Sequence, residues 1–238
     1  MASELKLYKK YEAGLRYLLA QSPDSRALVP ETEESAWERI GTKNEIEMFR
    51  ELAKPPEKLN KTRGVGVIAA PPQLVADVIT HDYEKWDDNI RGFKTLSEEH
   101  DEESGAVAET SWSRYSLGVP MMKDRDFVYC EVRQQAPGGL YIIYGESLSD
   151  EEAAQVKDVP AVKGVVRGKM GCSGWVVAPA QGGAASRVTY VSVTNLKGSF
   201  PPALVNQFTN DVPQTIHDVR KVVLAKLKSR ARLQAAQA

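Results

Sequence analysis

The feature that most constrains the fold of this chain is a succession of extended segments from residue 90 onward. Seven segments rich in β-branched and aromatic residues are separated by short turns of Gly, Pro and acidic residues. Strands joined by such short connections pair antiparallel, because a parallel return needs a crossover of a dozen residues or more. The pattern predicts one meandering antiparallel sheet, with strands at residues 90–96, 106–116, 126–134, 140–147, 162–170, 172–178 and 187–194, and turns at 98–103 and 136–139.

Other patterns precede these strands. Residues 4–20 place Leu and Tyr at helical spacing and predict an amphipathic N-terminal helix that packs on the sheet. Residues 37–49 predict a hairpin and residues 64–69 a further strand. A short helix is expected to begin at Pro71 and Pro72, because proline is favoured in the first turn of a helix.

The chain closes with a pattern typical of a long helix, at residues 201–227, followed by a tail beyond Ser229 that we expect to fray. Apolar residues recur along this helix every three or four positions. Pro213 interrupts the stripe, and we expect a kink there because proline removes a backbone hydrogen bond. The chain is therefore predicted to have an α+β fold, in which one helix covers the concave face of a curved antiparallel sheet.

Composition limits the classes of function. The 238 residues carry 31 Lys and Arg against 32 Asp and Glu, which argues against a nucleic-acid partner held by bulk electrostatics. Two cysteines, Cys130 and Cys172, stand far apart, and three histidines are scattered without zinc-site spacing. We therefore expect neither a metal nor another cofactor. A charged start and the lack of an apolar run of about 18 residues indicate a cytoplasmic protein without a membrane anchor.

Four groups of short motifs occur in a fixed order along the chain. They are Tyr-Glu-Lys-Trp-Asp at 83–87, Lys-Asp-Arg-Asp-Phe-Val at 123–128, Val-Val-Arg-Gly at 165–168 with Gly-Trp-Val-Val at 174–177, and Asn-Leu-Lys-Gly at 195–198 with two prolines at 201–202. In this order they resemble the START domain, the lipid-transfer family related to the steroidogenic acute regulatory protein. The resemblance runs from about Trp37 to Leu227. One departure is Asn195, where many members carry Asp, and this puts in doubt a salt bridge expected there.

The resemblance implies a helix-grip fold that encloses a hydrophobic tunnel for one lipid or sterol, with the closing helix and a nearby loop as its lid. Residues 36–229 would form this domain, residues 1–35 an N-terminal helix and connector packed on it, and residues 230–238 a tail. Most members are not enzymes, and the sequence shows no Ser-His-Asp order, activated cysteine or acid–base pair. The alternatives are a cyclase or hydrolase of the wider superfamily, or a lipid-gated interaction module.

Glu109 and Arg133 are the first candidates for a ligand-binding site. In sterol-binding relatives a Glu and an Arg at similar places form a charged pair inside the tunnel, where they would orient a hydroxyl or headgroup. A buried pair contributes little net stability, so its presence in a cavity favours a functional role. The alternative is a surface pair on the outer face, because the sequence does not fix which face each strand residue takes.

Further candidates come from the closing helix, two aromatic residues and an apolar loop. The predicted tunnel walls are Val205, Phe208, Val212 and Ile216, with Trp112 and Tyr144 as further aromatic surface if they face inward. Residues 117–122 form an apolar loop where the family has a loop facing the closing helix, and apolar residues are unusual in such a position. The predicted lid and membrane contacts are Leu117, Val119, Met121, Met122 and Pro213.

The expected partners are a lipid of the phospholipid or sterol class and, transiently, a membrane surface, with the chain acting as a monomer. In members that transfer phosphatidylcholine an Arg three residues before the Trp of the first motif holds the phosphate, and here that position is Tyr83. A basic cluster near the C-terminus could approach an anionic membrane, although a solvated helix face is the simpler interpretation.

Overall fold

The computed structural model describes residues 5–30, 32, 36–52, 61–198, 200 and 210–237. The N-terminal part contains the short 3₁₀ helices η1 (Lys9–Tyr11) and η2 (Arg26–Leu28) and, between them, helix α1 (Glu12–Gln21). The hairpin follows as β1 (Glu38–Lys43) and β2 (Ile46–Glu51), then strand β3 (Lys61–Ile68) and helices α2 (Pro72–His81) and α3 (Tyr83–Trp86).

The second half of the chain carries most of the sheet. Its strands are β4 (Ile90–Asp101), β5 (Ala106–Tyr115), β6 (Arg125–Ala136), β7 (Leu140–Ser147), β8 (Val166–Arg167), β9 (Lys169–Met170), β10 (Ser173–Ala180) and β11 (Ala185–Asn195). Helix α4 (Asp150–Gln155) follows β7, and η3 (Gln181–Gly183) lies between β10 and β11. The described part of the chain ends with η4 (Val212–Gln214) and α6 (Thr215–Gln237).

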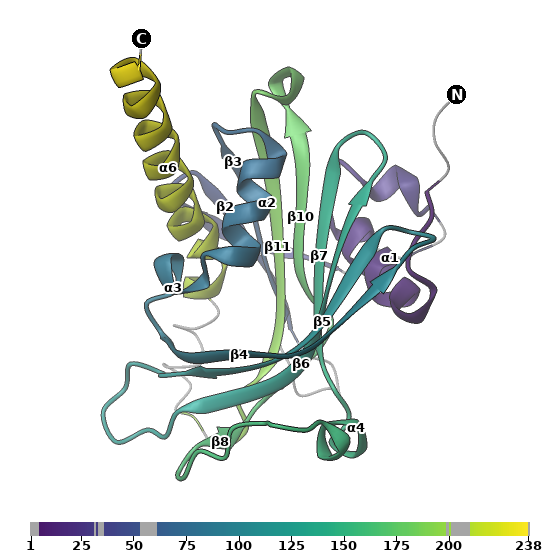
Figure 1. The fold of residues 1–238 in the computed structure, drawn as a ribbon, viewed down its shortest axis with the longest axis vertical. Helices are drawn as coiled ribbons and strands as arrows, with labels where there is room; N and C mark the ends of the chain where they lie inside the picture. The colour runs from purple at the N-terminus through teal and green to yellow at the C-terminus, as the bar shows by residue number, and fades with distance from the viewer. Residues whose placement is uncertain are drawn as a thin grey trace.

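The strands form one curved sheet in the order β1-β2-β3-β11-β10-β7-β6-β5-β4, with β8 beside β6 and β9 beside β11. Neighbours along this order pair antiparallel, and the two-residue strand β8 pairs with β6 in parallel. The antiparallel sheet with a covering C-terminal helix confirms the predicted fold class. Between β3 and β4 the chain crosses from one part of the sheet to its far edge through α2 and α3 (Figure 1).

Two local predictions were wrong. The acidic stretch 98–103 is mostly strand, because β4 continues to Asp101 and pairs there with Ala106 of β5, and only Glu102 and Glu103 lie in the turn that follows. Its charged side chains are compatible with a strand because β4 lies at the sheet edge, where they reach solvent. Residues 162–170, predicted as one strand, hold only the short strands β8 and β9.

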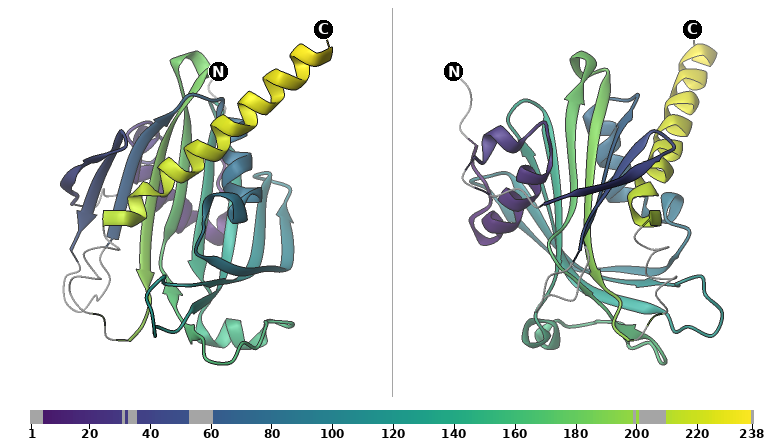
Figure 2. Two further views of the ribbon diagram at one scale, coloured as in Figure 1. Left: turned by 90° about the vertical axis from the view of Figure 1, so that its left-hand side faces the viewer. Right: turned by 180° about the vertical axis from the view of Figure 1, so that it is seen from behind.

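The two faces of the sheet are covered by different helices. One buried cluster joins α1 to the outer, convex face and includes Leu15, Leu19, Ile142 and Tyr144. A second cluster lies on the concave face, where α2 and α6 pack over Ile143, Trp175, Val177 and Val188. Figures 1 and 2 show α1 on one side of the sheet and α6 crossing the strands on the other.

Helix α6 is anchored to the body along its first half. Ile216, Val219 and Val223 are fully buried in the concave-face cluster. Pro213 lies in the 3₁₀ turn η4 immediately before α6, so the helical hydrogen bonding changes at the position where a kink was expected. The helix then continues to Gln237, beyond the predicted end at Leu227, because Ala, Leu, Gln, Lys and Arg in this stretch favour helix.

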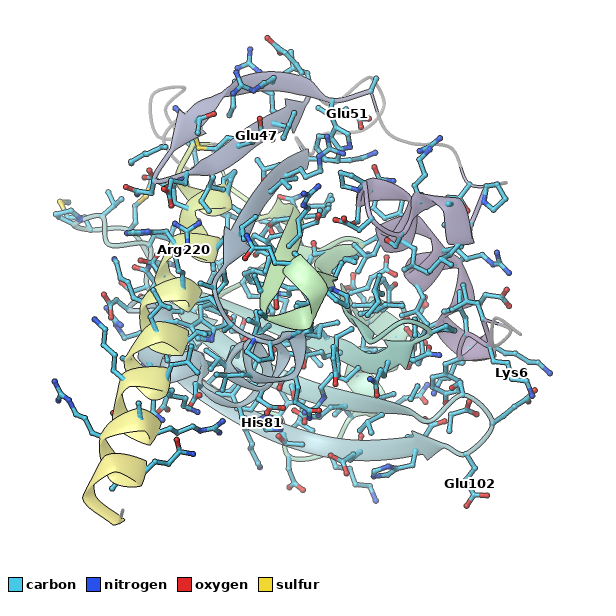
Figure 3. The ribbon with its side chains drawn as sticks, turned by 90° about the horizontal axis from the view of Figure 1, so that it is seen from above. Lys6, Glu47, Glu51, His81, Glu102 and Arg220 are labelled. Atoms are coloured by element: carbon cyan, nitrogen blue, oxygen red, sulfur yellow. The ribbon has the colours of Figure 1, made fainter. Side chains whose placement is uncertain are left out.

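Polar contacts add to this anchoring at two points. Arg220 donates to the backbone oxygen of Asn44 (2.8 Å) in the β1–β2 turn, beside which α6 passes (Figure 3). Asp82, between α2 and α3, is paired with Lys226 of α6 and accepts from Lys85 Nζ at 2.6 Å. Burial acts to raise the pKa of the Asp82 carboxyl, but the two ammonium groups outweigh it and hold the pKa below its ordinary value.

Candidate functional site

Strand register decides which face Glu109 and Arg133 occupy. Arg133 of β6 pairs with Ile143 of β7, and Ile143 belongs to the concave-face cluster under α2 and α6. Glu109 of β5 pairs with Glu131, two residues before Arg133. Side chains directly opposite in an antiparallel pair share a face, and alternate residues of a strand share a face. Glu109, Glu131 and Arg133 therefore all point toward the concave side of the sheet.

Glu109 and Arg133 form a close, largely buried ion pair. The Arg133 Nη2 atom lies 2.6 Å from Glu109 Oε2, and the two side chains are 19% and 12% exposed. The other carboxylate oxygen of Glu109 accepts hydrogen bonds from Thr95 Oγ1 at 2.9 Å and Ser111 Oγ at 2.5 Å. These neutral donors come from β4 and β5, so three strands fix the position of the carboxylate.

Glu131 is a third member of this group that the sequence analysis missed. Its side chain is 12% exposed, and its Oε1 atom lies 3.7 Å from Arg133 Nε. The Tyr83 hydroxyl, on the short helix α3, donates a hydrogen bond to Glu131 Oε2. Burial raises the pKa of Glu131 to about 7, although the Tyr83 hydrogen bond and the charge of Arg133 act in the opposite direction. We refer to Tyr83, Glu109, Glu131 and Arg133 as the inward polar cluster.

One donor in the inward polar cluster is unsatisfied. Arg133 Nε is buried and has no hydrogen-bond partner among the residues that the structure describes, since 3.7 Å to Glu131 is too long for a hydrogen bond. A buried donor without a partner costs roughly 1–3 kcal/mol, so such groups usually meet a ligand or an ordered water. Arg133 Nε and Glu131 Oε1 are thus a buried donor and an acceptor that lie side by side, 3.7 Å apart.

Aromatic side chains surround the inward polar cluster on the concave side. Tyr83 stacks on Phe93 with ring centres 5.3 Å apart and contacts Trp86 at 5.4 Å. Trp86 meets Trp175 edge-on at 6.1 Å, and Trp175 stacks on Tyr190 at 4.0 Å. Burial raises the pKa of Tyr190 to about 12 and that of Tyr83 well above its ordinary value. The surroundings therefore offer an aromatic surface suited to apolar contact.

The comparisons with known proteins agree with this geometry. The family model of the START domain matches residues 26–222. This chain belongs to the START domain family. The match covers most of the chain and includes the sheet, α2, α3 and the first part of α6. It confirms the resemblance found in the sequence motifs. A search of the curated proteins found no match.

Solved structures share the fold of this START domain. Human StAR-related lipid transfer protein 5 is 18% identical, with a TM-score of 0.70 over 92% of this chain and 99% of that one. Human STARD10 is 20% identical, with a TM-score of 0.68 over 89% and 84% of the two chains. A fragment of the STAR-related lipid transfer protein of Xanthomonas axonopodis is also 20% identical, with a TM-score of 0.62 over 79% and 99%.

Two predicted aromatic ligand contacts lie on the wrong face of this START domain. Tyr144 belongs to the convex-face cluster, where it packs against Tyr11 and Gly14 of the N-terminal part. Trp112 pairs with Val128 and so faces opposite to Glu109, and its Nε1 atom donates to Asp126 Oδ2 at 2.9 Å. Both are even-numbered residues on strands whose odd-numbered residues point inward, so neither is retained as a ligand contact.

The predicted wall residues on the closing helix differ in where the structure places them. Val205 and Phe208 lie outside the described residues, and Val212 is half-buried in η4. Ile216 is fully buried, and its side chain fills the space left by Gly64 and Gly66 of β3. Pro213, predicted as part of the lid, is likewise buried against Gly64. Ile216 and Pro213 thus pack the closing helix against strand β3 of the sheet.

The predicted lid loop is exposed at its tip. Leu117, Val119 and Met122 are half-buried, whereas Met121 is fully exposed, at 103% of its reference area. Met121 also has a positive backbone φ of 66°, which is unfavourable for a residue with a side chain. Exposing an apolar side chain on a strained turn offers no benefit in water alone. The tip of the loop therefore carries one fully exposed apolar side chain.

Two motif residues have structural roles that the sequence did not reveal. Arg125 is buried and donates to the backbone oxygens of Leu196 (2.6 Å) and Lys197 (3.1 Å), which follow β11. Asp126 accepts a bidentate pair of hydrogen bonds from Arg167, both 2.9 Å long. Arg125 thus ties the start of β6 to the segment that leads toward the closing helix. Asn195, where many members carry Asp, instead accepts a hydrogen bond from the Lys197 backbone.

Within the described residues, no group of three or more His, Cys, Asp and Glu side chains is arranged to hold a metal ion. None of the helices in the same part of the chain combines the length and apolar character that a membrane span requires.

Proposed function

We propose that this START domain binds one lipid or sterol between the concave face of its sheet and the closing helix, and carries it as a monomer between membranes in the cytoplasm. The observation that supports the proposal is the inward polar cluster. It places an ion pair, a second carboxyl and an unsatisfied donor on a face whose buried cluster is mainly aromatic and aliphatic. Ligand sites combine a mainly apolar wall with a few convergent polar groups in this way.

The polar cluster favours a ligand with a hydroxyl group. A hydroxyl between Arg133 Nε and Glu131 Oε1 would accept a hydrogen bond from the first and donate one to the second. Two carboxyl groups against one guanidinium disfavour a phosphate, because the approach of a further anion is repelled. Tyr83, at the position where phosphatidylcholine-transfer members carry Arg, adds no positive charge. The apolar remainder of the ligand would supply most of the affinity, at about 25 cal/mol per Å² buried.

Ligand loading tests the proposal directly. The purified protein is incubated with a mixed extract of membrane lipids, separated from free lipid and weighed by native mass spectrometry, and the bound molecule is then identified after organic extraction. One bound lipid per chain, enriched in hydroxyl-bearing species, is the expected result. A protein that takes up no lipid of any class would refute the carrier function. Recovery of a chemically altered ligand would instead indicate an enzyme, and loading that merely creates affinity for a protein would indicate an interaction module.

The exposed tip of the lid loop gives a prediction for the transfer step. Replacing Met121 by glutamate is expected to slow lipid transfer between vesicles at least tenfold, because entry of an apolar side chain into the membrane surface contributes roughly 1.5–3 kcal/mol. Lipid loading itself should be unchanged, since Met121 does not contact the inward polar cluster.

The matched control is Leu28→Glu, which places the same charge at another exposed apolar position, on η2. This variant is expected to transfer lipid at the rate of the unmodified protein. Equal transfer rates for the Met121 and Leu28 variants would show that the loop does not contact the membrane.

A further inference from the structure

The C-terminal end of α6 has an unusual charge distribution. The whole chain is nearly neutral, with 31 cations and 32 anions, yet residues 215–237 of α6 carry six Lys or Arg and only one acid, Asp218. Three of these cations have acidic partners, because Arg220 contacts Glu45, Lys221 contacts Asp218 and Lys226 contacts Asp82. The other three cations, which have no acidic partner among the described residues, lie in the last turns of the helix.

Within the described residues, no ion pair, hydrogen bond or buried-cluster contact joins those last turns to the rest of the domain. Every side chain from Lys228 to Gln234 is exposed, and α6 projects past the sheet at this end (Figures 2 and 3). Lys228, Arg230 and Arg232 form no ion pair or hydrogen bond with any residue that the structure describes. Leu233, beside them, is 63% exposed. We call these four residues the basic helix tip.

We propose that the basic helix tip is a docking site for an anionic membrane surface. Lys228 and Arg232 are four residues apart and lie on one side of the helix, while Arg230 lies on the other. All three fall within about 6 Å along the helix axis, at 1.5 Å per residue. This is shorter than the Debye length of about 8 Å at physiological salt, so all three charges act on one surface together. Leu233 lies at the same level along the helix axis and supplies an apolar contact.

A membrane fits this tip better than a nucleic acid does. The exposed leucine among the cations gains free energy in the interfacial region of a bilayer but has no counterpart on a phosphate backbone. The remainder of the chain carries more acids than bases, so it would repel an extended polyanion lying along the domain. Contact confined to one end of a helix suits a flat surface that touches only the tip.

The tip lies far from the lid loop. In Figure 1 the C-terminal end of α6 and the loop between β5 and β6 lie toward opposite ends of the molecule. The proposed docking site is therefore distinct from the lid.

Vesicle flotation tests the docking site. The probes are phosphatidylcholine vesicles with and without phosphatidylserine, and the test variant is Lys228→Gln/Arg230→Gln/Arg232→Gln. The unmodified protein is expected to float with phosphatidylserine vesicles at low salt and to be released by high salt. The variant should bind about 100-fold more weakly, because each basic residue near an anionic surface contributes about 1 kcal/mol, or roughly fivefold. Helical content should hardly change, since the tip packs on nothing.

The control variant is Lys9→Gln/Arg39→Gln/Lys43→Gln, which removes three cations that already have acidic partners. These side chains are also exposed, but each lies within 4 Å of a carboxylate, at 3.7, 3.6 and 3.9 Å. The control is expected to bind like the unmodified protein. Equal flotation of both triple variants, flotation that does not require phosphatidylserine, or tighter binding to duplex DNA than to vesicles would overturn the proposal. Lipid loading, measured separately, reports on the carrier function whatever the outcome.

Discussion

Replacing Arg133 by leucine is expected to abolish lipid loading and to destabilise the domain. The substitution removes the only cation among the described residues that is paired with the buried carboxylate of Glu109. It also takes away the attraction that Arg133 exerts on Glu131. Loss of one partner from a buried ion pair costs about 3–5 kcal/mol, because an uncompensated charge is left behind. Thermal unfolding and native mass spectrometry after incubation with lipid measure the two effects.

A second variant separates folding from ligand binding. In Glu109→Gln/Arg133→Leu the orphaned charge is removed as well, so stability should largely recover while the ligand hydroxyl still lacks its donor. The matched control is Asp126→Asn/Arg167→Leu, which dismantles a bidentate ion pair that contacts Trp112 on the opposite side of the sheet. Loading is expected to survive in this control. A folded Glu109/Arg133 variant that still takes up lipid normally would rule out the inward polar cluster as the ligand site.

Replacing Glu131 by glutamine is expected to stabilise the protein at pH 8 and to leave its stability nearly unchanged at pH 4. Burial raises the pKa of Glu131 from 4.5 to about 7, so between these values the folded state holds a proton that the unfolded state has lost. The contribution of this group to stability is therefore full below pH 4.5, falls as pH rises, and has been lost above pH 7. At about 1.4 kcal/mol per pKa unit, the ionised carboxyl costs about 3 kcal/mol.

Urea unfolding at several pH values measures this effect. The difference between Glu131→Gln and the unmodified protein should grow from near zero at pH 4 to a maximum above pH 7. Glu146→Gln is the control, because Glu146 also accepts a hydrogen bond from a tyrosine, Tyr144, but lies on the outer side of the sheet. No comparable gain at high pH is expected there. A stability difference for Glu131→Gln that does not vary with pH would contradict the assignment of a buried, proton-holding carboxyl.

The sequence was sufficient to predict the architecture. Short turns between extended segments impose antiparallel neighbours, and the stripe that includes Ile216 requires a surface for the closing helix to cover. The misread stretch 98–103 shows where this reasoning fails. Composition alone cannot distinguish a charged edge strand from a charged turn, because both expose their side chains to water.

The site was harder to predict than the fold, because it depends on strand parity. Moving a strand by one residue exchanges its two faces, and the sequence does not state the register between β5 and β6. The register places Glu109 and Arg133 together and sends Trp112 to the opposite face. Glu131 could have been found from its spacing of two from Arg133, since residues two apart on a strand share a face. Its partner Tyr83 could not, because only the fold brings α3 over β6.

The sheet that holds this site is open, so its two edge strands could pair with other chains at high protein concentration. The edge strands β1 and β4 both expose charged side chains along their length, among them Glu38 and Arg39 on one and Arg91 and Lys94 on the other. Unpaired strand edges invite other chains to add strands, and charged side chains oppose such pairing. Charged edges of this kind therefore disfavour edge-to-edge polymerisation of the wide sheet.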